Sequence, residues 1–167
     1  VRVLKIEGRG RSPEYVKVVT RVYRQAVDAW LNGEWSSEKL EQWNKDLSSV
    51  YNRGFWDGYY LGQKVGEWSK GYGSQATTKK TFVGTVTNYF KNIGVAEIKI
   101  ETGNLTVGDR IYIMGTTTGV YEDTLEEIRV DLKTTDKAIK GEFCSIPTKS
   151  LIRRGDKVYV IEDIIPE

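Results

Sequence analysis

The apolar pattern of this chain of 167 residues changes from helical to strand-like near residues 76–80. Over residues 15–30, apolar side chains recur every three or four positions, which places them on one face of a helix. From Thr81 onward, short runs of partly alternating apolar and polar residues are separated by glycine, asparagine and aspartate, as in an all-β domain. We therefore predict an α+β protein with one domain over residues 1–75, a linker over residues 76–80 and a second domain over residues 81–167.

The second domain is predicted to be a small β-barrel or sandwich, because its short runs lie at the spacing found in such folds. One of these runs is continuous over residues 119–132. Two strands follow a glycine–aspartate pair, at Asp109 and at Asp156, and such pairs are typical of the turn that begins a strand. A domain of about 85 residues can bury enough apolar surface to fold alone.

The first domain has a single predicted strand, over residues 1–7, where apolar and polar side chains alternate. A helix is predicted to begin after Ser12 and to end at Gly33, and a shorter helix is predicted to begin near Ser36. A lone strand leaves its backbone N–H and C=O groups unpaired. We therefore infer that the strand belonged to a larger sheet whose other strands lie upstream of Val1.

A charged cluster follows this predicted strand and contains Glu7, Arg9 and Arg11. The end of a strand that precedes a helix is where ligands bind in α/β proteins. Arg9 and Arg11 could hold an anion between them, and Glu7 could orient an arginine or act as an acid or base. The alternative is a loop of ion pairs that covers the end of the sheet. These three residues are the candidate catalytic residues.

A second cluster contains Asn52, Arg53 and Phe55, next to Tyr51, at the start of a connector over residues 52–73 that is rich in glycine and aromatic residues. Arginine, asparagine and aromatic side chains suit the binding of a flat or anionic ligand. They equally suit a loop that is held in place by its rings. Asn52, Arg53 and Phe55 are the candidate substrate-binding residues.

The chain contains no histidine and one cysteine, Cys144. An internal disulfide, a zinc site with about four Cys or His ligands and a cluster site with about four cysteines are therefore excluded. Catalysis by Ser-His-Asp or Cys-His groups is also excluded for this chain, whereas carboxylate chemistry is not. No apolar run approaches the ~20 residues of a membrane helix. We predict no metal, no membrane association and a cytoplasmic location.

The net charge of +2 is distributed unevenly along the chain. Residues 1–80 hold 14 lysines and arginines against 9 acidic residues, whereas residues 81–167 hold 11 against 14. The positive excess of the first part is compatible with an anionic partner, but it is smaller than the basic patch of a typical nucleic-acid-binding domain.

Two segments, KIEGRGRSPEYVKVVTRVYRQAVD and YNRGFWDGYYLG, together resemble motifs of the U-32 (collagenase-like) peptidase family. KIEGRGRSPEYVKVVTRVYRQAVD, residues 5–28, resembles the segment that closes the catalytic α/β barrel of that family, although Gly10 stands where members often have methionine or threonine. YNRGFWDGYYLG, residues 51–62, resembles a second motif of the family. Residues 81–163 are similar to the small β-barrel at the C-terminus of many members, which is similar in turn to domain 2 of translation elongation factors.

The resemblance implies that the chain is the C-terminal portion of such a protein. It would consist of a strand–helix–helix remnant of the α/β barrel followed by the translation-factor-like β-barrel. Carried over by position, Glu7, Arg9, Arg11, Asn52 and Arg53 are expected near the active site of the family. The fragment alone is expected to be inactive, and its first partner is expected to be the upstream catalytic domain.

The resemblance leaves the function of the parent protein open. In one hypothesis the parent is a collagenase-like peptidase, and the barrel recognises a protein substrate. In another, the parent hydroxylates transfer or ribosomal RNA with an iron–sulfur cluster held by upstream cysteines, and the barrel contacts the RNA. In a third, the barrel only stabilises the catalytic domain. No cofactor is expected to be bound by this chain itself.

Overall fold

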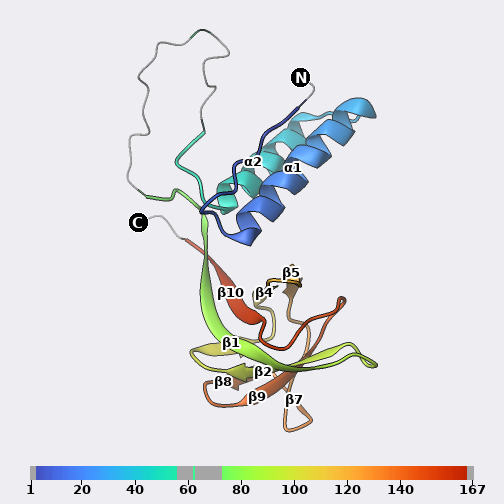
Figure 1. Cartoon of the computed structure of the whole chain (residues 1–167), viewed down its shortest axis with the longest axis vertical. Helices are drawn as coiled ribbons and strands as arrows, with labels where there is room; N and C mark the ends of the chain where they lie inside the picture. The colour runs from blue at the N-terminus through green and yellow to red at the C-terminus, as the bar shows by residue number, and fades with distance from the viewer. Residues whose placement is uncertain (1–2, 56–61, 63–72, 165–167) are drawn as a thin grey trace. The chain divides into compact units, whose positions relative to one another are not determined.

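Figure 1 shows a computed structural model of the chain, which describes residues 3–55, 62 and 73–164. The connector predicted over residues 52–73 therefore lies largely outside the described residues.

Contacts divide the chain into two compact units. The first contains the described residues up to Thr78 together with Ile164, and the second runs from Lys79 to Asp163. Two helices lie in the described part of the first unit, and antiparallel strands make up the second. The predicted α+β class is therefore confirmed.

The first unit is built on helix α1 (Pro13–Leu31) and helix α2 (Ser37–Ser49). Proline at the start of α1 has no N–H to leave unsatisfied, which suits the first turn of a helix. The backbone N–H of Lys39 donates a hydrogen bond of 3.2 Å to Oγ of Ser36, which caps α2. The apolar faces of the two helices form one small core. Its buried residues are Val18, Val19, Val22, Ala29, Trp43 and Val50.

The strand predicted over residues 1–7 is wrong for the part of it that the structure describes. Residues 3–7 form no strand, and the side chains of Val3 and Leu4 are 82% and 50% exposed. A strand requires the backbone of a neighbouring strand as its hydrogen-bonding partner, and no described segment pairs with these residues. Alternation of side chains alone therefore does not form a strand here.

The second unit contains the strands of two sheets. Within the described residues they are β1 (Thr78–Phe90), β2 (Val95–Ile100), β3 (Asn104–Thr106), β4 (Arg110–Gly115), β5 (Gly119–Thr124), β6 (Ile128–Val130), β7 (Lys133–Thr135), β8 (Lys137–Ile139), β9 (Phe143–Pro147) and β10 (Lys157–Asp163). The larger sheet has the order β5-β4-β10-β1-β2-β9-β6-β7, and β3 pairs with β8. Strand β1, green in Figure 1, bends along its length and begins inside the predicted linker.

The strands enclose the larger of the two hydrophobic cores. Ile98, Ile111 and Ile113 are fully buried in it, together with twelve further residues. Burial of a side chain of this size stabilises a fold by about 1.5–3 kcal/mol, so a core of this extent can hold a small β unit together.

The loop before β10 is fixed by a buried carboxylate. Asp156 is 5% exposed, and its Oδ2 accepts hydrogen bonds from Thr118 Oγ1 (2.5 Å) and from the backbone N–H of Arg153 (2.9 Å). Gly115 at the end of β4 leaves the space for it, because a Cβ there would lie 1.8 Å from Asp156 Oδ1. Asp156 therefore has a structural role.

Candidate functional site

The first unit contains a hollow of about 330 Å³ beside its two helices. Helix α1 contributes Tyr15, Val19 and Tyr23, which lie one turn apart on the same face, and α2 contributes Leu47. The turn before α1 and the loop after α2 complete the wall with Arg11 and with residues Tyr51, Asn52, Arg53, Gly54 and Phe55. The hollow thus joins residues from both charged clusters of the sequence.

Two guanidinium groups contact Tyr51 at this hollow. Cζ of Arg11 lies 3.8 Å from the centre of the Tyr51 ring, which is a cation–π contact. Nε of Arg53 donates a hydrogen bond of 2.7 Å to the Tyr51 hydroxyl oxygen. This hydrogen bond, aided by the positive charges of Arg53 and Arg11, lowers the pKa of Tyr51. The hydroxyl therefore senses a positive potential.

The described part of the wall of the hollow carries positive charge. Among the residues that the structure describes, the lining includes two arginines and no aspartate or glutamate. Tyr15, Val19, Leu47 and Phe55 add apolar surface, and the Phe55 side chain is 60% exposed. Such a wall favours a ligand that carries both a negative group and an apolar group.

Asn52 shapes the loop that carries Arg53. Its Nδ2 donates hydrogen bonds to the backbone oxygens of Val50 (3.0 Å) and Ser48 (3.3 Å), and its Oδ1 accepts one from the N–H of Gly54 (3.1 Å). Gly54 has φ of +88°, a conformation that glycine adopts without steric cost. The amide of Asn52 is thus used inside the loop, and we assign it to positioning Arg53.

The turn before α1 separates the members of the first predicted cluster. The N–H of Arg11 donates to the backbone oxygen of Gly8 (3.0 Å), and Gly10 within this turn has φ of +68°. The N–H of Arg9 donates to Oε1 of Glu7 (3.0 Å), and both side chains are exposed. Neither of them lines the hollow.

The structure thus brings Arg11 together with Asn52, Arg53 and Phe55, and leaves Glu7 and Arg9 outside the hollow. The lining residues Tyr15, Val19, Tyr23 and Leu47 were not among the candidates. The spacing of Tyr15, Val19 and Tyr23 places them on one helix face, so the signal for three of these residues was present in the sequence.

The described residues include no group of three His, Cys, Asp or Glu side chains placed to hold a metal ion. Cys144 is buried in the core of the second unit, and burial raises the pKa of its thiol to about 12. A protonated single thiol does not fit an iron–sulfur cluster, which requires about four thiolates. No helix in the described part of the chain is both long enough and apolar enough to cross a bilayer.

Comparison with known proteins identifies relatives of this chain. Residues 1–70 match the sequence model of peptidase family U32. A collagenase of Porphyromonas gingivalis is 53% identical over 159 residues, which are 95% of this chain and 44% of the collagenase. The tRNA hydroxylation protein P1 of Bacillus subtilis is 30% identical over 131 residues, which are 75% of this chain and 29% of that protein.

A solved C-terminal domain of a protein assigned to the U32 peptidases, from Geobacillus thermoleovorans, is 18% identical, with a TM-score of 0.45. The match covers 47% of this chain and 96% of that domain. The chain spans less than half the length of the Porphyromonas gingivalis collagenase and of the Bacillus subtilis tRNA hydroxylation protein.

Proposed function

Because the chain belongs to peptidase family U32, we propose that it supplies part of the substrate-binding surface of a collagenase-like peptidase. In this proposal the hollow of the first unit binds a carboxylate of a peptide substrate, either at its C-terminus or on an acidic side chain. The observation that carries the proposal is that Arg11 and Arg53 both contact Tyr51, in a wall whose described residues include no aspartate or glutamate.

The chemistry of the wall supports a carboxylate ligand. A guanidinium group presents N–H donors in a planar fork that matches the two oxygens of a carboxylate. Arg11 is exposed at the rim and its guanidinium is oriented by stacking on Tyr51, so it loses little side-chain freedom when an anion binds. The apolar residues Val19, Leu47 and Phe55 then contact the neighbouring substrate side chain.

We assign no catalytic step to this chain. Glu7 and Arg9 remain candidate catalytic residues, and they need reacting groups from the rest of the parent protein. The second unit is proposed to be the translation-factor-like β-barrel expected from the sequence, acting as an accessory recognition module. The chain alone is expected to show no peptidase turnover.

An alternative function follows from the relationship to the Bacillus subtilis tRNA hydroxylation protein. Guanidinium groups also bind phosphates, and the exposed ring of Phe55 could stack on a base. In this alternative an iron–sulfur cluster would be held by cysteines elsewhere in the parent protein, because Cys144 does not fit one. The present chain would then contribute contacts to RNA.

A binding experiment separates the two proposals. The probe is a fluorescein-labelled Gly-Pro-Leu-Gly peptide with a free C-terminal carboxylate, compared by fluorescence anisotropy with the same peptide as its C-terminal amide. The carboxylate form should bind about tenfold more tightly, because a charge-assisted hydrogen bond contributes about 1.5–3 kcal/mol. Arg11→Gln should remove this preference. Arg24→Gln is the matched control, since Arg24 is an exposed arginine of α1 that pairs with Asp28 outside the hollow.

Equal binding of the carboxylate and amide peptides by the unaltered chain would refute the peptide proposal. Unfractionated transfer RNA serves as the second probe in a salt series. Binding that weakens steeply with salt, and that is lost in Arg11→Gln but kept in Arg24→Gln, would favour the RNA alternative.

A further inference from the structure

The second unit has a groove of its own that the proposed function does not use. Two adjoining hollows of about 200 and 420 Å³ share Ile93, Glu127 and Pro147 in their walls, and so form one continuous surface. The pairing of Val95 with Pro147 between β2 and β9 brings the turn that carries Ile93 beside the end of β9. We call this surface the β-unit groove.

One end of the β-unit groove is apolar and exposed. Ile93 is 71% exposed and Phe90 is 42% exposed, both at the turn between β1 and β2. Leu132 lies across from them at the tip of the β6–β7 hairpin and is 90% exposed. These side chains are large and apolar, and the second unit leaves them in water.

Leu132 is unusual in its backbone as well as in its exposure. Asp131 and Leu132 have φ of 49° and 65°, as in a type I′ hairpin turn, where glycine or asparagine is preferred at the second position. A leucine in this conformation is strained, and burial of its side chain within the described chain does not offset the cost of that strain. Contact with another molecule would bury it.

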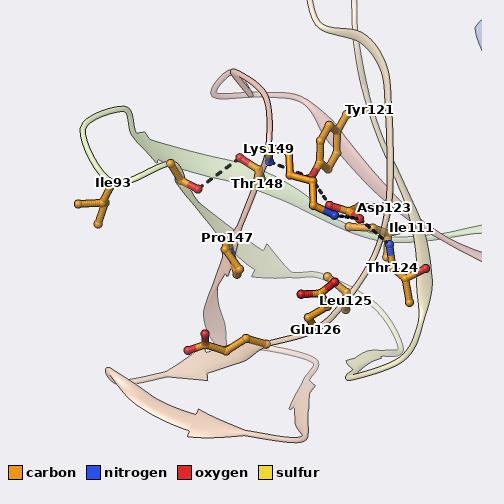
Figure 2. A pocket seen from close by; sticks show the side chains of 12 residues that line it. Ile93, Ile111, Tyr121, Asp123, Thr124, Leu125, Glu126, Pro147, Thr148 and Lys149 are labelled. Atoms are coloured by element: carbon orange, nitrogen blue, oxygen red, sulfur yellow. Dashed lines mark hydrogen bonds and ion pairs between the residues drawn. The ribbon is translucent and has the colours of Figure 1, made fainter.

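The other end of the β-unit groove is acidic. Asp123, Glu126 and Glu127 line it, with Lys149 as its one basic residue. Lys149 Nζ is already engaged, 2.8 Å from Asp123 Oδ1. Figure 2 shows Asp123 on one side of this hollow and Ile93 on the other, with Pro147 between them.

A hydrogen-bonded network fixes the acidic end. The Tyr121 hydroxyl donates a hydrogen bond of 2.5 Å to Asp123 Oδ2 and accepts one of 3.1 Å from the N–H of Lys149. Burial and the bond to Asp123 raise the pKa of Tyr121 to about 12, so this hydroxyl remains a donor at neutral pH. Glu127 pairs with Arg129. Among the described residues, no hydrogen bond or ion pair engages the exposed carboxylate of Glu126.

We propose that the β-unit groove binds a peptide segment of a protein in which an arginine or lysine lies next to a large apolar residue. The basic side chain would contact Glu126 and the neighbouring carboxylates, and the apolar residue would pack between Ile93, Phe90 and Leu132. Charge complementarity selects this occupant over RNA. The three carboxylates of the groove outnumber its two basic residues, because Lys149 pairs with Asp123 and Arg129 with Glu127, so the remaining carboxylate of Glu126 would repel an RNA phosphate. This site does not depend on the hollow of the first unit, whose charge preference is opposite.

The test uses the full 167-residue chain and a fluorescein-labelled Gly-Ser-Leu-Arg-Leu-Ser-Gly peptide, with a second peptide in which glutamate replaces arginine. Saturable binding of the arginine peptide below 1 mM is expected, with at least about tenfold weaker binding of the glutamate peptide. Amide NMR shifts should cluster at residues 90–95, 126–133 and 145–149. No saturable binding, or equal binding of the two peptides, would overturn the proposal.

Two variants locate the site without damaging the fold. Leu132→Gly removes the apolar side chain and also suits the left-handed turn, so the protein should remain folded while peptide binding weakens about tenfold. Glu126→Gln should weaken binding about threefold, with a smaller salt dependence. Ile139→Ala and Glu41→Gln are the matched controls, because both residues are exposed and lie outside the groove.

Unchanged binding in Leu132→Gly and Glu126→Gln would contradict the assigned surface. Competition by transfer RNA at these same NMR positions would replace the peptide occupant by RNA, and would also contradict the proposal.

Discussion

Tyr51 in the first unit and Tyr121 in the second unit have opposite hydrogen-bonding partners. The Tyr51 hydroxyl accepts a hydrogen bond from Arg53, which lowers its pKa, whereas the Tyr121 hydroxyl donates to Asp123 and its pKa is raised to about 12. The same side chain therefore reports a cationic hollow in one unit and an acidic groove in the other. One chain thus offers surfaces for ligands of opposite charge.

The two units also differ in how they are stabilised. The first has a small core between two helices, and Trp30 and Leu31 at the end of α1 remain 73% and 72% exposed. The second has a larger core in which Ile98 and Ile111 are fully buried. We expect the second unit to resist unfolding more strongly by itself, because buried apolar area is the main source of stability.

The largest predicted effect separates the stabilities of the two units. Gly115→Ala should lower the free energy of unfolding of the second unit by about 1–3 kcal/mol, because the new Cβ overlaps the buried carboxylate of Asp156. All five tryptophans precede residue 79, so tryptophan fluorescence in a urea titration reports the first unit, and the methyl NMR signal of Ile98 reports the second.

In this variant the unfolding transition reported by Ile98 should move to a lower urea concentration. The free energy of unfolding reported by tryptophan fluorescence should change by less than about 0.5 kcal/mol. Thr117→Ala, an exposed change in the neighbouring turn, is the control and should move neither transition. A parallel shift of both signals would show that the two units unfold together. It would contradict the expected difference in stability between them.

An intermediate effect concerns alkaline pH. The pKa of Tyr121 is raised in the folded state, so its stabilising contribution is complete below about pH 10 and is lost as the pH rises toward about 12. The pKa of Tyr51 is lowered, so its contribution is present above pH 10 and is lost as the pH falls through the folded-state pKa. Site-specific ¹³Cζ NMR of tyrosine follows both titrations.

Asp123→Asn should lower the pKa of Tyr121 toward its ordinary value of 10, because a carboxylate acceptor is lost, although burial still raises it. The same variant should leave the Tyr51 titration unchanged and so serves as its internal control. A Tyr121 pKa that does not move would show that burial, without the bond to Asp123, raises the pKa of Tyr121.

The smallest predicted effect is an increase in stability. Leu132→Gly should raise the free energy of unfolding of the second unit by about 1 kcal/mol, since the left-handed conformation at this position costs a leucine roughly that amount. Urea unfolding followed by the Ile98 methyl signal measures it. A loss of stability would indicate that the Leu132 side chain stabilises the hairpin and is not reserved for a partner.

Local signals explain which parts of the fold were predictable. The start of α1 at Pro13 and the cap of α2 at Ser36 depend on neighbouring residues, and both helices begin where the sequence indicated. The run over residues 119–132 was predicted as one strand, but it forms β5 and β6 with Leu125 buried between them. Packing against distant strands determines that break, and the periodicity of a local run carries no information about such packing.

The candidate site was predictable as residue clusters but not as a surface. Arg11 and Arg53 were identified from their local patterns, whereas their meeting at Tyr51 depends on how α1 contacts α2. Glu7 was grouped with Arg11 by proximity in sequence, and the turn at Gly10 separates them. In the second unit, Ile93 and Leu132 lie in turns, so their shared groove follows only from the strand pairing.

The most direct test of the account follows the ¹³Cζ signals of both tyrosines in the unaltered chain while the Gly-Pro-Leu-Gly peptide with a free carboxylate is added. The account predicts a saturable shift of the Tyr51 signal, no shift of the Tyr121 signal, and a much smaller Tyr51 shift with the amide peptide. A Tyr51 signal that stays fixed at saturating carboxylate peptide, or that moves equally with the amide, would contradict the proposed substrate-binding role of the hollow.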